Sequence, residues 1–136
     1  MYKSIIIPVD LSGDTSGSEM IEQARLVAAE GAQVHFVHVV EAVPVYLEAE
    51  IPSQLIVDST DKSQQKLRDI ATASGLQSTV HVRSGAPANE ILEEARDREA
   101  DLIIIKSHKP GFQDYFLGST AARVVRHAKC SVLVMR

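Results

Sequence analysis

The sequence predicts an α/β fold: one doubly wound, five-stranded parallel sheet with four crossover helices. Uninterrupted apolar runs such as residues 5–9 and 102–105 are typical of strands that are buried on both faces. Between these runs, apolar residues recur at helical spacing. Strands that alternate with helices predict right-handed crossovers on both faces of a sheet. With 136 residues and 45% apolar content, the chain fits a single domain, 1–136.

The individual elements follow from these runs and from the turn residues that bound them. The strands are expected at 5–9, 34–40, 79–82, 102–105 and 132–134. The helices are expected at 17–30 before a stop at Gly31, from Ser59 or Thr60 to Gly75, from Pro87 onward, and from Gly118 through Ala128. The third strand alternates apolar with polar residues, so we expect it at a sheet edge with one wet face.

Two further segments are predicted from composition. Residues 41–58 contain Pro44 and Pro52, which break a helix, yet they are too apolar for a solvated linker, so we expect this segment to cover another part of the protein. The charged residues that follow Leu92 are interpreted as a solvated helix face. They are Glu93, Glu94, Arg96, Asp97, Arg98 and Glu99.

Composition excludes several classes of partner. The net charge of −4 is spread without a basic block, so we expect no nucleic acid and no membrane surface as partner. The first apolar run is too short for a signal peptide, which favours a cytoplasmic protein. The single cysteine, Cys130, excludes an intramolecular disulfide and is interpreted as a small buried apolar residue. No metal-ligand spacing is present.

The last strand predicts a homodimer. From Ser131 to Arg136 the chain forms an apolar edge strand that no later element covers. A bare edge of this kind invites association. Antiparallel pairing with the same strand of a second copy would remove the edge, so we expect a two-fold dimer.

A candidate anion site lies where the last helix begins. Gly118, Ser119 and Thr120 offer backbone N–H groups, hydroxyl donors and the positive end of a helix dipole, a combination that suits a phosphate. This helix follows a strand and a polar loop, so its start lies at the carboxyl edge of the sheet, where ligands of open α/β sheets bind. We expect the Gly118 amide to be available there. A Gly118 amide already bonded to protein would count against the site.

Asp10 ends the first strand at the same edge. Its carboxylate serves either as a turn cap with Ser12 or as a ligand contact. No catalytic set can be assembled, because Ser119 has only His108 as a candidate partner. A phosphoacceptor receiver domain is disfavoured, since Asp10 is followed by Leu11 rather than by a second acid, and the third strand ends without an aspartate.

Several segments along the chain together form a specific pattern. They are the opening run to Asp10, the end of the second strand at His38, the Gly85-Ala86-Pro87 turn with Ile91, and the closing segments Gly118-Ser119-Thr120-Ala121, Val124-Val125-Arg126-His127-Ala128 and Cys130-Ser131-Val132-Leu133-Val134. In these segments the chain resembles the universal stress protein family over essentially its full length. The closest branch is similar to small ATP-binding proteins. Their Ser-His-Arg-Pro loop here reads Ser107-His108-Lys109-Pro110.

The resemblance implies a Rossmann-like fold of the adenine nucleotide alpha hydrolase type. It implies sheet order 3-2-1-4-5, dimerisation through the fifth strand, and a nucleotide at the carboxyl edge. By this resemblance, Pro8, Val9, Asp10 and Val39 line the adenine and ribose end, Ile105 lies nearby, and Lys106, His108, Lys109, Gly118, Ser119 and Thr120 surround the phosphates.

The phosphate loop departs from the family pattern. Lys106 and Lys109 stand where the ATP-binding branch has glycines, and eight residues rather than nine separate Lys109 from Gly118. A lysine side chain obstructs the close backbone approach that glycine permits, but an ammonium can neutralise a phosphate. For Lys106, a solvated lysine at a strand end is the alternative interpretation.

Three functions therefore stay open. The first is a cytoplasmic dimer that binds ATP or a related adenine nucleotide (AMP or ADP), with or without Mg²⁺, as a regulatory ligand in a stress response. The second is a nucleotide-independent stress or interaction protein with a degenerate phosphate loop. The third, less favoured, is a true ATP hydrolase or phosphotransferase.

Overall fold

Five parallel strands form one sheet in the order β3-β2-β1-β4-β5 in a computed structural model that describes residues 1–11, 17–41, 45–107 and 117–136. The strands are β1 (Tyr2–Pro8), β2 (Ala28–Val40), β3 (Ser78–Ser84), β4 (Leu102–Lys106) and β5 (Ser131–Met135). The helices are α1 (Ser18–Val27), the single-turn α2 (Val45–Glu48), α3 (Ser53–Ser74), α4 (Pro87–Asp97) and α5 (Ser119–His127). This order confirms the predicted fold. None of the helices in the described ranges is long and apolar enough to cross a membrane.

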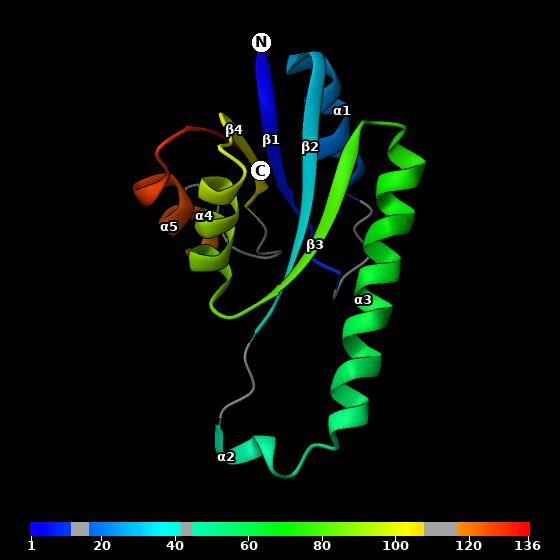
Figure 1. The fold of residues 1–136 in the computed structure, drawn as a ribbon. Coiled ribbons are helices and arrows are strands. Elements are labelled where there is room, and N and C mark those ends of the chain that lie inside the picture. Colours follow the sequence, from blue (N-terminus) through cyan, green and yellow to red (C-terminus); the bar gives the residue numbers. More distant parts are fainter. Residues whose placement is uncertain (12–16, 42–44, 108–116) are drawn as a thin grey trace.

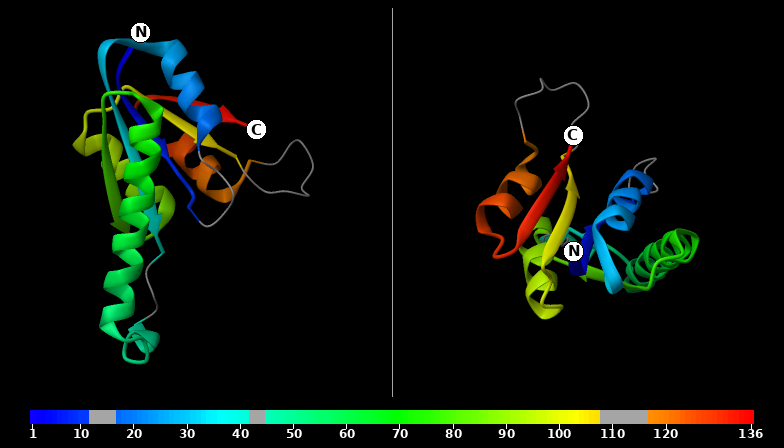
Figure 2. Two further views of the ribbon diagram at one scale, coloured as in Figure 1. Left: turned by 90° about the vertical axis from the view of Figure 1, so that its right-hand side faces the viewer. Right: turned by 90° about the horizontal axis from the view of Figure 1, so that it is seen from above.

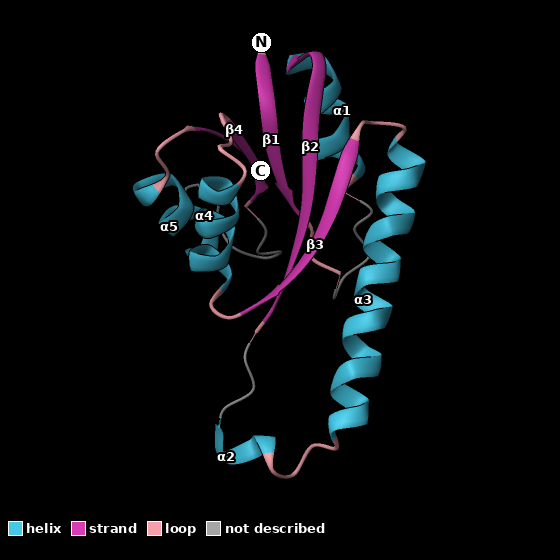
Figure 3. Ribbon diagram, viewed as in Figure 1, coloured by secondary structure: helices cyan, strands magenta, loops and turns pink. Residues whose placement is uncertain are grey.

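Helices cover both faces of the sheet (Figures 1 and 3). On one face, Ile5 and Ile7 of β1 pack with Met20 of α1 and Leu67 of α3. On the other face, Ile6 packs among buried residues of α4 and α5, namely Ala88, Ile91, Ala95, Ala121 and Val124. Consecutive strand residues point to opposite faces, so a strand between two helical layers needs apolar residues at every position. This explains the unbroken runs in β1 and β4.

The first helix ends earlier than its apolar spacing predicts. α1 stops at Val27, and β2 begins at once at Ala28, so Gly31 lies within β2 and is not a helix stop. The register between β1 and β2 shifts between the pairs Tyr2↔Ala28 and Ser4↔Gln33. Gly31 is one of the extra residues of β2 between these two pairs, and its φ is 76°. Gly31 therefore supplies the positive φ at this irregularity in β2.

The segment between β2 and β3 departs most from expectation. α3 starts at Ser53, directly after Pro52, and not near Ser59 or Thr60. Proline is compatible with a helix start because the N–H that it lacks has no intrahelical partner there. The first half of α3 and α2 extend past the carboxyl ends of the strands (Figures 1 and 2). Within the described residues this segment covers little: Leu55, Ile56 and Val57 are exposed, contrary to the prediction for residues 41–58.

β3 is an edge strand, as predicted, but His81 and Arg83 are half-buried and do not form a wet face. His81 and Arg83 lie beneath α4, where both contact the carboxylate of Glu94. The Glu94 side chain is only 1% exposed, so the interpretation of all the charged residues after Leu92 as solvated is wrong for Glu94. A charge inside a protein requires partners of opposite charge, and β3 supplies them.

Cys130 lies just before β5 and is half-buried against the apolar cluster beneath α4 and α5. Burial raises the pKa of its thiol, and the nearby Asp101 carboxylate adds to this effect. A protonated, half-buried thiol behaves as a small apolar group, in agreement with the prediction.

Candidate functional site

The candidate site lies at the carboxyl edge of the sheet between β1 and β4. These strands are neighbours, yet the chain leaves β1 toward α1 on one face and leaves β4 toward α5 on the other. In doubly wound sheets, ligands bind outside the strand ends at such a reversal of winding.

The end of β1 is held firmly by backbone contacts. The Val9 N–H donates to the Val37 carbonyl at 2.8 Å, and the Val9 carbonyl accepts a hydrogen bond from His38 Nδ1 at 3.0 Å. Val9 itself is buried, and Pro8 before it is half-buried. These contacts present Asp10 at the rim with an exposed side chain. Whether Asp10 serves as a turn cap or as a ligand contact stays a prediction.

The end of β4 lies beside β1 and is tied to two other elements. Ile105 is buried among residues of α4 and α5, and Ser107 N–H donates to the Met135 carbonyl of β5 at 2.7 Å. Lys106 lies between them, and its Nζ is 2.9 Å from Oε2 of Glu19 in the first turn of α1. Lys106 is therefore not an unpaired ammonium, because it joins β4 to α1 through a pair that solvent can reach.

The start of α5 differs in one respect from the expected anion cradle. The Gly118 N–H donates to Ser107 Oγ at 2.9 Å, so this amide is bonded to protein. The expectation of an available Gly118 amide is therefore wrong. The Gly118 carbonyl accepts the first helical hydrogen bond, from Ala122 N–H at 2.9 Å. The N–H groups of Ser119 and Thr120 lie in the first turn, where a helix offers no internal acceptor. Their role as donors to a phosphate stays a prediction.

The remaining predicted site residues divide into two groups. Val39 is half-buried on β2, two residues beyond Val37, which pairs with Pro8 of β1. It therefore lies on the strand next to the end of β1. His108 and Lys109 lie outside the described residues. The structure thus brings together the ends of β1 and β4 and the start of α5 on one rim.

Three contacts at this rim were not assigned a role from sequence. His38 bonds the Val9 carbonyl, Ser107 bonds the Gly118 amide, and Glu19 bonds Lys106. Ser107 carries a local signal, since a hydroxyl between a strand and a helix start is a common acceptor for backbone N–H groups. Glu19 carries none for this pair, because an acid in the first turn of a helix is already accounted for by the helix dipole.

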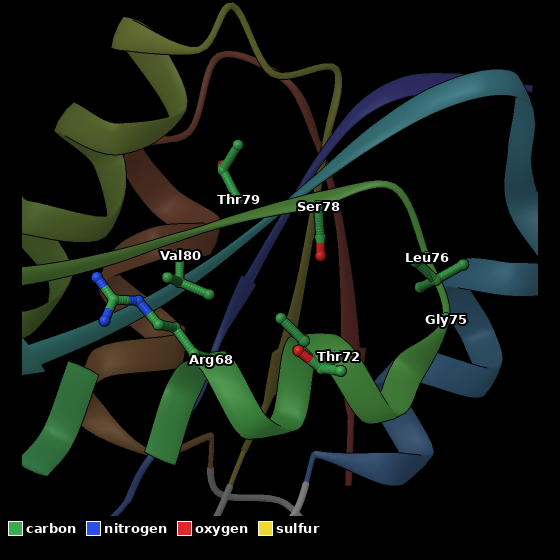
Figure 4. A pocket seen from close by; sticks show the side chains of 8 residues that line it. Arg68, Thr72, Gly75, Leu76, Ser78, Thr79 and Val80 are labelled. Carbon is green, nitrogen blue, oxygen red and sulfur yellow. The ribbon is translucent and has the colours of Figure 1, made fainter. Parts of the chain in front are cut away.

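An open groove of about 490 Å³ lies at the other end of the sheet, between α3 and the beginning of β3 (Figure 4). Its lining residues are Arg68, Ala71, Thr72, Gly75, Leu76, Ser78, Thr79 and Val80. Only Arg68 among them is charged, so the groove lacks a cluster of reactive groups. Within the described ranges, no group of three His, Cys, Asp or Glu residues could hold a metal ion.

Comparisons with known proteins match the whole chain. The model of the Universal stress protein family matches residues 1–136. This chain belongs to the universal stress protein family. Universal stress protein MJ0531 of Methanocaldococcus jannaschii is 35% identical over 143 residues, covering 100% of this chain and 83% of that protein.

Solved structures agree with this assignment. The hypothetical protein MJ0577 matches with a TM-score of 0.78 at 25% identity, covering 99% of this chain and 96% of that chain. A universal stress protein from Archaeoglobus fulgidus in complex with dAMP has a TM-score of 0.67 at 21% identity, covering 99% of this chain and 98% of that chain. A further universal stress protein, in complex with cAMP, has a TM-score of 0.66 at 22% identity, covering 99% of this chain and 97% of that chain. These last two establish the shared fold.

Proposed function

We propose that this universal stress protein binds ATP or a related adenine nucleotide as a regulatory ligand, at the carboxyl rim between β1 and β4. The observation that supports this best is that Asp10, Lys106 and the first turn of α5 all follow or end neighbouring strands at the carboxyl edge, where the winding of the sheet reverses. The two structural neighbours in complex with dAMP and cAMP also support an adenine nucleotide as ligand. A cytoplasmic location belongs to the same proposal.

The proposed roles follow from position on the rim. Pro8, Val9 and Asp10 would line the adenine and ribose end together with Val39, and Ile105 would lie close by. Lys106 and the first turn of α5 would take the phosphates, because an ammonium and the N–H groups of a helix start both favour negative charge. His108 and Lys109 belong to the phosphate end by family resemblance. When Mg²⁺ is bound with the nucleotide, it supplies further neutralisation of phosphate charge.

A thermal-shift titration with ATP tests the proposal. A ligand at 100 times its dissociation constant stabilises the folded state by about 2.7 kcal/mol, which raises the melting temperature measurably. ADP, AMP, dAMP and cAMP should be titrated in parallel, each with and without Mg²⁺. No shift at millimolar concentration of any of the five would contradict the proposal.

Two variants locate the ligand. Gly118 has φ −58° and ψ 153°, a conformation that any residue adopts, so Gly118→Leu adds bulk at the rim without backbone strain. This variant should fold but lose the shift. Lys129→Met removes an exposed lysine near the opposite end of α5 and serves as the control, which should retain the full shift. A full shift in Gly118→Leu would place the nucleotide elsewhere.

A second candidate function is favoured by two of the contacts described above. The Gly118 amide is bonded to Ser107 and the Lys106 ammonium is paired with Glu19, so both groups are satisfied by the protein itself. A nucleotide-independent stress or interaction protein would need nothing more at this rim. The same titration separates the two candidates, because a protein of the second kind shows no nucleotide-dependent shift.

We also propose that β5 pairs antiparallel with β5 of a second copy. β5 is the last strand on its side of the sheet, and Val132 to Val134 are only half-buried. The Met135 carbonyl accepts a hydrogen bond from Ser107, so Met135 directs its backbone groups toward β4, and Val134 directs its own outward. An outward row of N–H and C=O groups is a template for a further strand.

Proline substitution tests the dimer. Val134→Pro removes an outward N–H and leaves the hydrogen bonds between β4 and β5 in place, so light scattering should show a monomer with a retained fold. Leu133→Pro removes an inward N–H and should instead lower the stability of the protomer. A dimeric Val134→Pro variant, or a monomeric wild-type protein, would overturn the proposed interface.

A further inference from the structure

The ion pair between Lys106 and Glu19 lies at the switch point of the sheet. Leu102 and Ile104 of β4 belong to the apolar cluster beneath α1, and Lys106 continues this alternate series, so its side chain lies on the α1 side of the sheet. There its Nζ meets Oε2 of Glu19 at 2.9 Å, across 87 positions of sequence. The pair therefore joins β4 to the first turn of α1.

The two charges stay accessible to solvent. The Glu19 side chain is 62% exposed and that of Lys106 is 28% exposed. Exposed ion pairs contribute little to folding stability, because water and salt screen the attraction and two flexible side chains must be ordered. The pair is thus poorly suited to hold the fold together, and it can open at little cost.

A phosphate would compete with the Glu19 carboxylate. Both are anions with oxygen acceptors, and both are favoured near a lysine ammonium and near the start of a helix. Glu19 is attached to the protein, so its carboxylate is always present at high local concentration. A ligand phosphate must therefore displace it, and the free energy needed to open the pair is the same for every nucleotide that does so.

We propose that Glu19 competes with ligand phosphate for the Lys106 ammonium and so lowers the affinity of the site for every nucleotide whose phosphates reach Lys106. The inference rests on the proposed adenine-nucleotide function and adds a determinant of affinity to it. A ligand that needs Lys106 binds only those molecules in which the pair is open, so its apparent dissociation constant rises by the inverse of that open fraction. Lys106 is the contact residue, and Glu19 acts through it.

A double-mutant cycle tests the competition. Dissociation constants for ATP, ADP and AMP would be measured by calorimetry at low salt for the wild type, Glu19→Gln, Lys106→Met and the double variant. Glu19→Gln should bind ATP and ADP up to about fivefold more tightly, the range that an exposed ion pair provides, and should bind AMP more tightly by no larger a factor. Lys106→Met should lower the ATP:AMP affinity ratio. In the Lys106→Met background, Glu19→Gln should bring no gain.

The control is Glu22→Gln, one turn further along α1. Glu22 is 69% exposed and pairs with Arg25, so this variant removes the same charge from the same helix without touching Lys106. It should leave all three affinities nearly unchanged. A thermal melt without ligand verifies that each variant is folded, and we expect little change because all of these pairs are exposed.

Four results would overturn the inference. An unchanged affinity in Glu19→Gln would show that the carboxylate does not compete. A gain that persists in the Lys106→Met background, or that Glu22→Gln reproduces, would show that only the overall charge matters. If no nucleotide binds the wild type or any variant at millimolar concentration, the proposed function fails together with this inference. If nucleotides bind tightly but the substitution of Glu19 changes no affinity, the inference fails and the proposed function stands.

Discussion

Arg83 Nη1 donates a hydrogen bond of 2.6 Å to Oε2 of Glu94, which ties the edge strand β3 to α4. The other carboxylate oxygen of Glu94 accepts from Arg98 Nε at 2.8 Å and lies 3.5 Å from His81 Nε2. Burial would raise the pKa of the Glu94 carboxyl, but hydrogen bonds from Arg98 and Arg83 outweigh burial and lower it. Glu94 is therefore a buried, ionised group with cationic partners on two sides.

Glu94→Gln is expected to destabilise the protein strongly. The substitution removes the charge that the half-buried Arg83 and the exposed Arg98 share at the buried Glu94, and loss of hydrogen bonds between charged groups costs about 1.5–3 kcal/mol. Urea denaturation should show a lower midpoint with an unchanged slope. Glu93→Gln is the matched control, because Glu93 is 51% exposed and binds the same Arg83, and it should cost less than about 0.5 kcal/mol. Equal losses in the two variants would contradict this account of the cluster.

Two histidines beside Glu94 predict a loss of stability in acid. Arg98 donates to His81 Nδ1 at 3.1 Å, His81 Nε2 lies 2.8 Å from Thr79 Oγ1, and this hydroxyl lies 2.7 Å from His35 Nδ1. An arginine can only donate, so His81 Nδ1 accepts and Nε2 carries the proton. Burial lowers the pKa of His35, with Arg98 adding to it; burial also lowers the pKa of His81, although Glu94 opposes this.

The sign of the pH dependence follows from these lowered pKa values. Below pH 6.5, the unfolded chain takes up protons at these histidines that the folded protein does not, so the free energy of unfolding falls. The fall ends below the folded-state pKa values, and near pH 4.5 the lowered pKa of Glu94 adds a further loss. Urea midpoints between pH 5 and 8 would measure the slope. His35→Asn with His81→Asn should flatten it, whereas the exposed His127→Asn should not. A wild-type midpoint that is constant or rises toward pH 5 would refute the prediction.

Ser107→Ala should weaken the junction between β4 and α5. The change removes the acceptor of the Gly118 N–H and leaves the backbone bond from Ser107 N–H to Met135 in place. Loss of one acceptor at a helix start costs about 1 kcal/mol, which thermal melting of the ligand-free protein detects. Ser119→Ala is the control, since Ser119 is exposed in the same turn, and it should melt close to the wild type. The reverse order of the two melting temperatures would argue against the hydroxyl acceptor.

Gly75→Ala should destabilise the end of α3 by about 1 kcal/mol, because Gly75 has φ 69°, a left-handed conformation that alanine adopts with strain. A Cβ at Gly75 would meet no atom within 4 Å, so crowding adds nothing to this cost. Gly75→Asn should cost less, since asparagine tolerates this conformation. Urea denaturation of the two variants isolates the free-energy cost of the left-handed backbone conformation. An equal loss of stability in both would show that another factor dominates.

Local patterns in the sequence were enough to predict the architecture and the position of the rim. Apolar runs without interruption predicted the buried strands, because a strand between two helical layers has no wet face. Asp10 follows β1, and Lys106 and Gly118 flank the loop after β4, so chain order alone placed these residues at the carboxyl edge. Helix boundaries were less accurate. Gly31 and Pro52 are compatible with more than one local conformation, and strand pairing decided between the alternatives at Gly31.

What the sequence determined by itself is the layered α/β fold, the family and the rim, because each depends on residues that are close together along the chain. Only the tertiary structure decided the partners of individual charges. Glu93 and Glu94 are adjacent in sequence, and the orientation of α4 over Arg83 buries only Glu94. The Lys106–Glu19 pair joins residues 87 positions apart. No periodicity encodes such a pair, because it depends on which strand end approaches which helix start once the sheet is assembled.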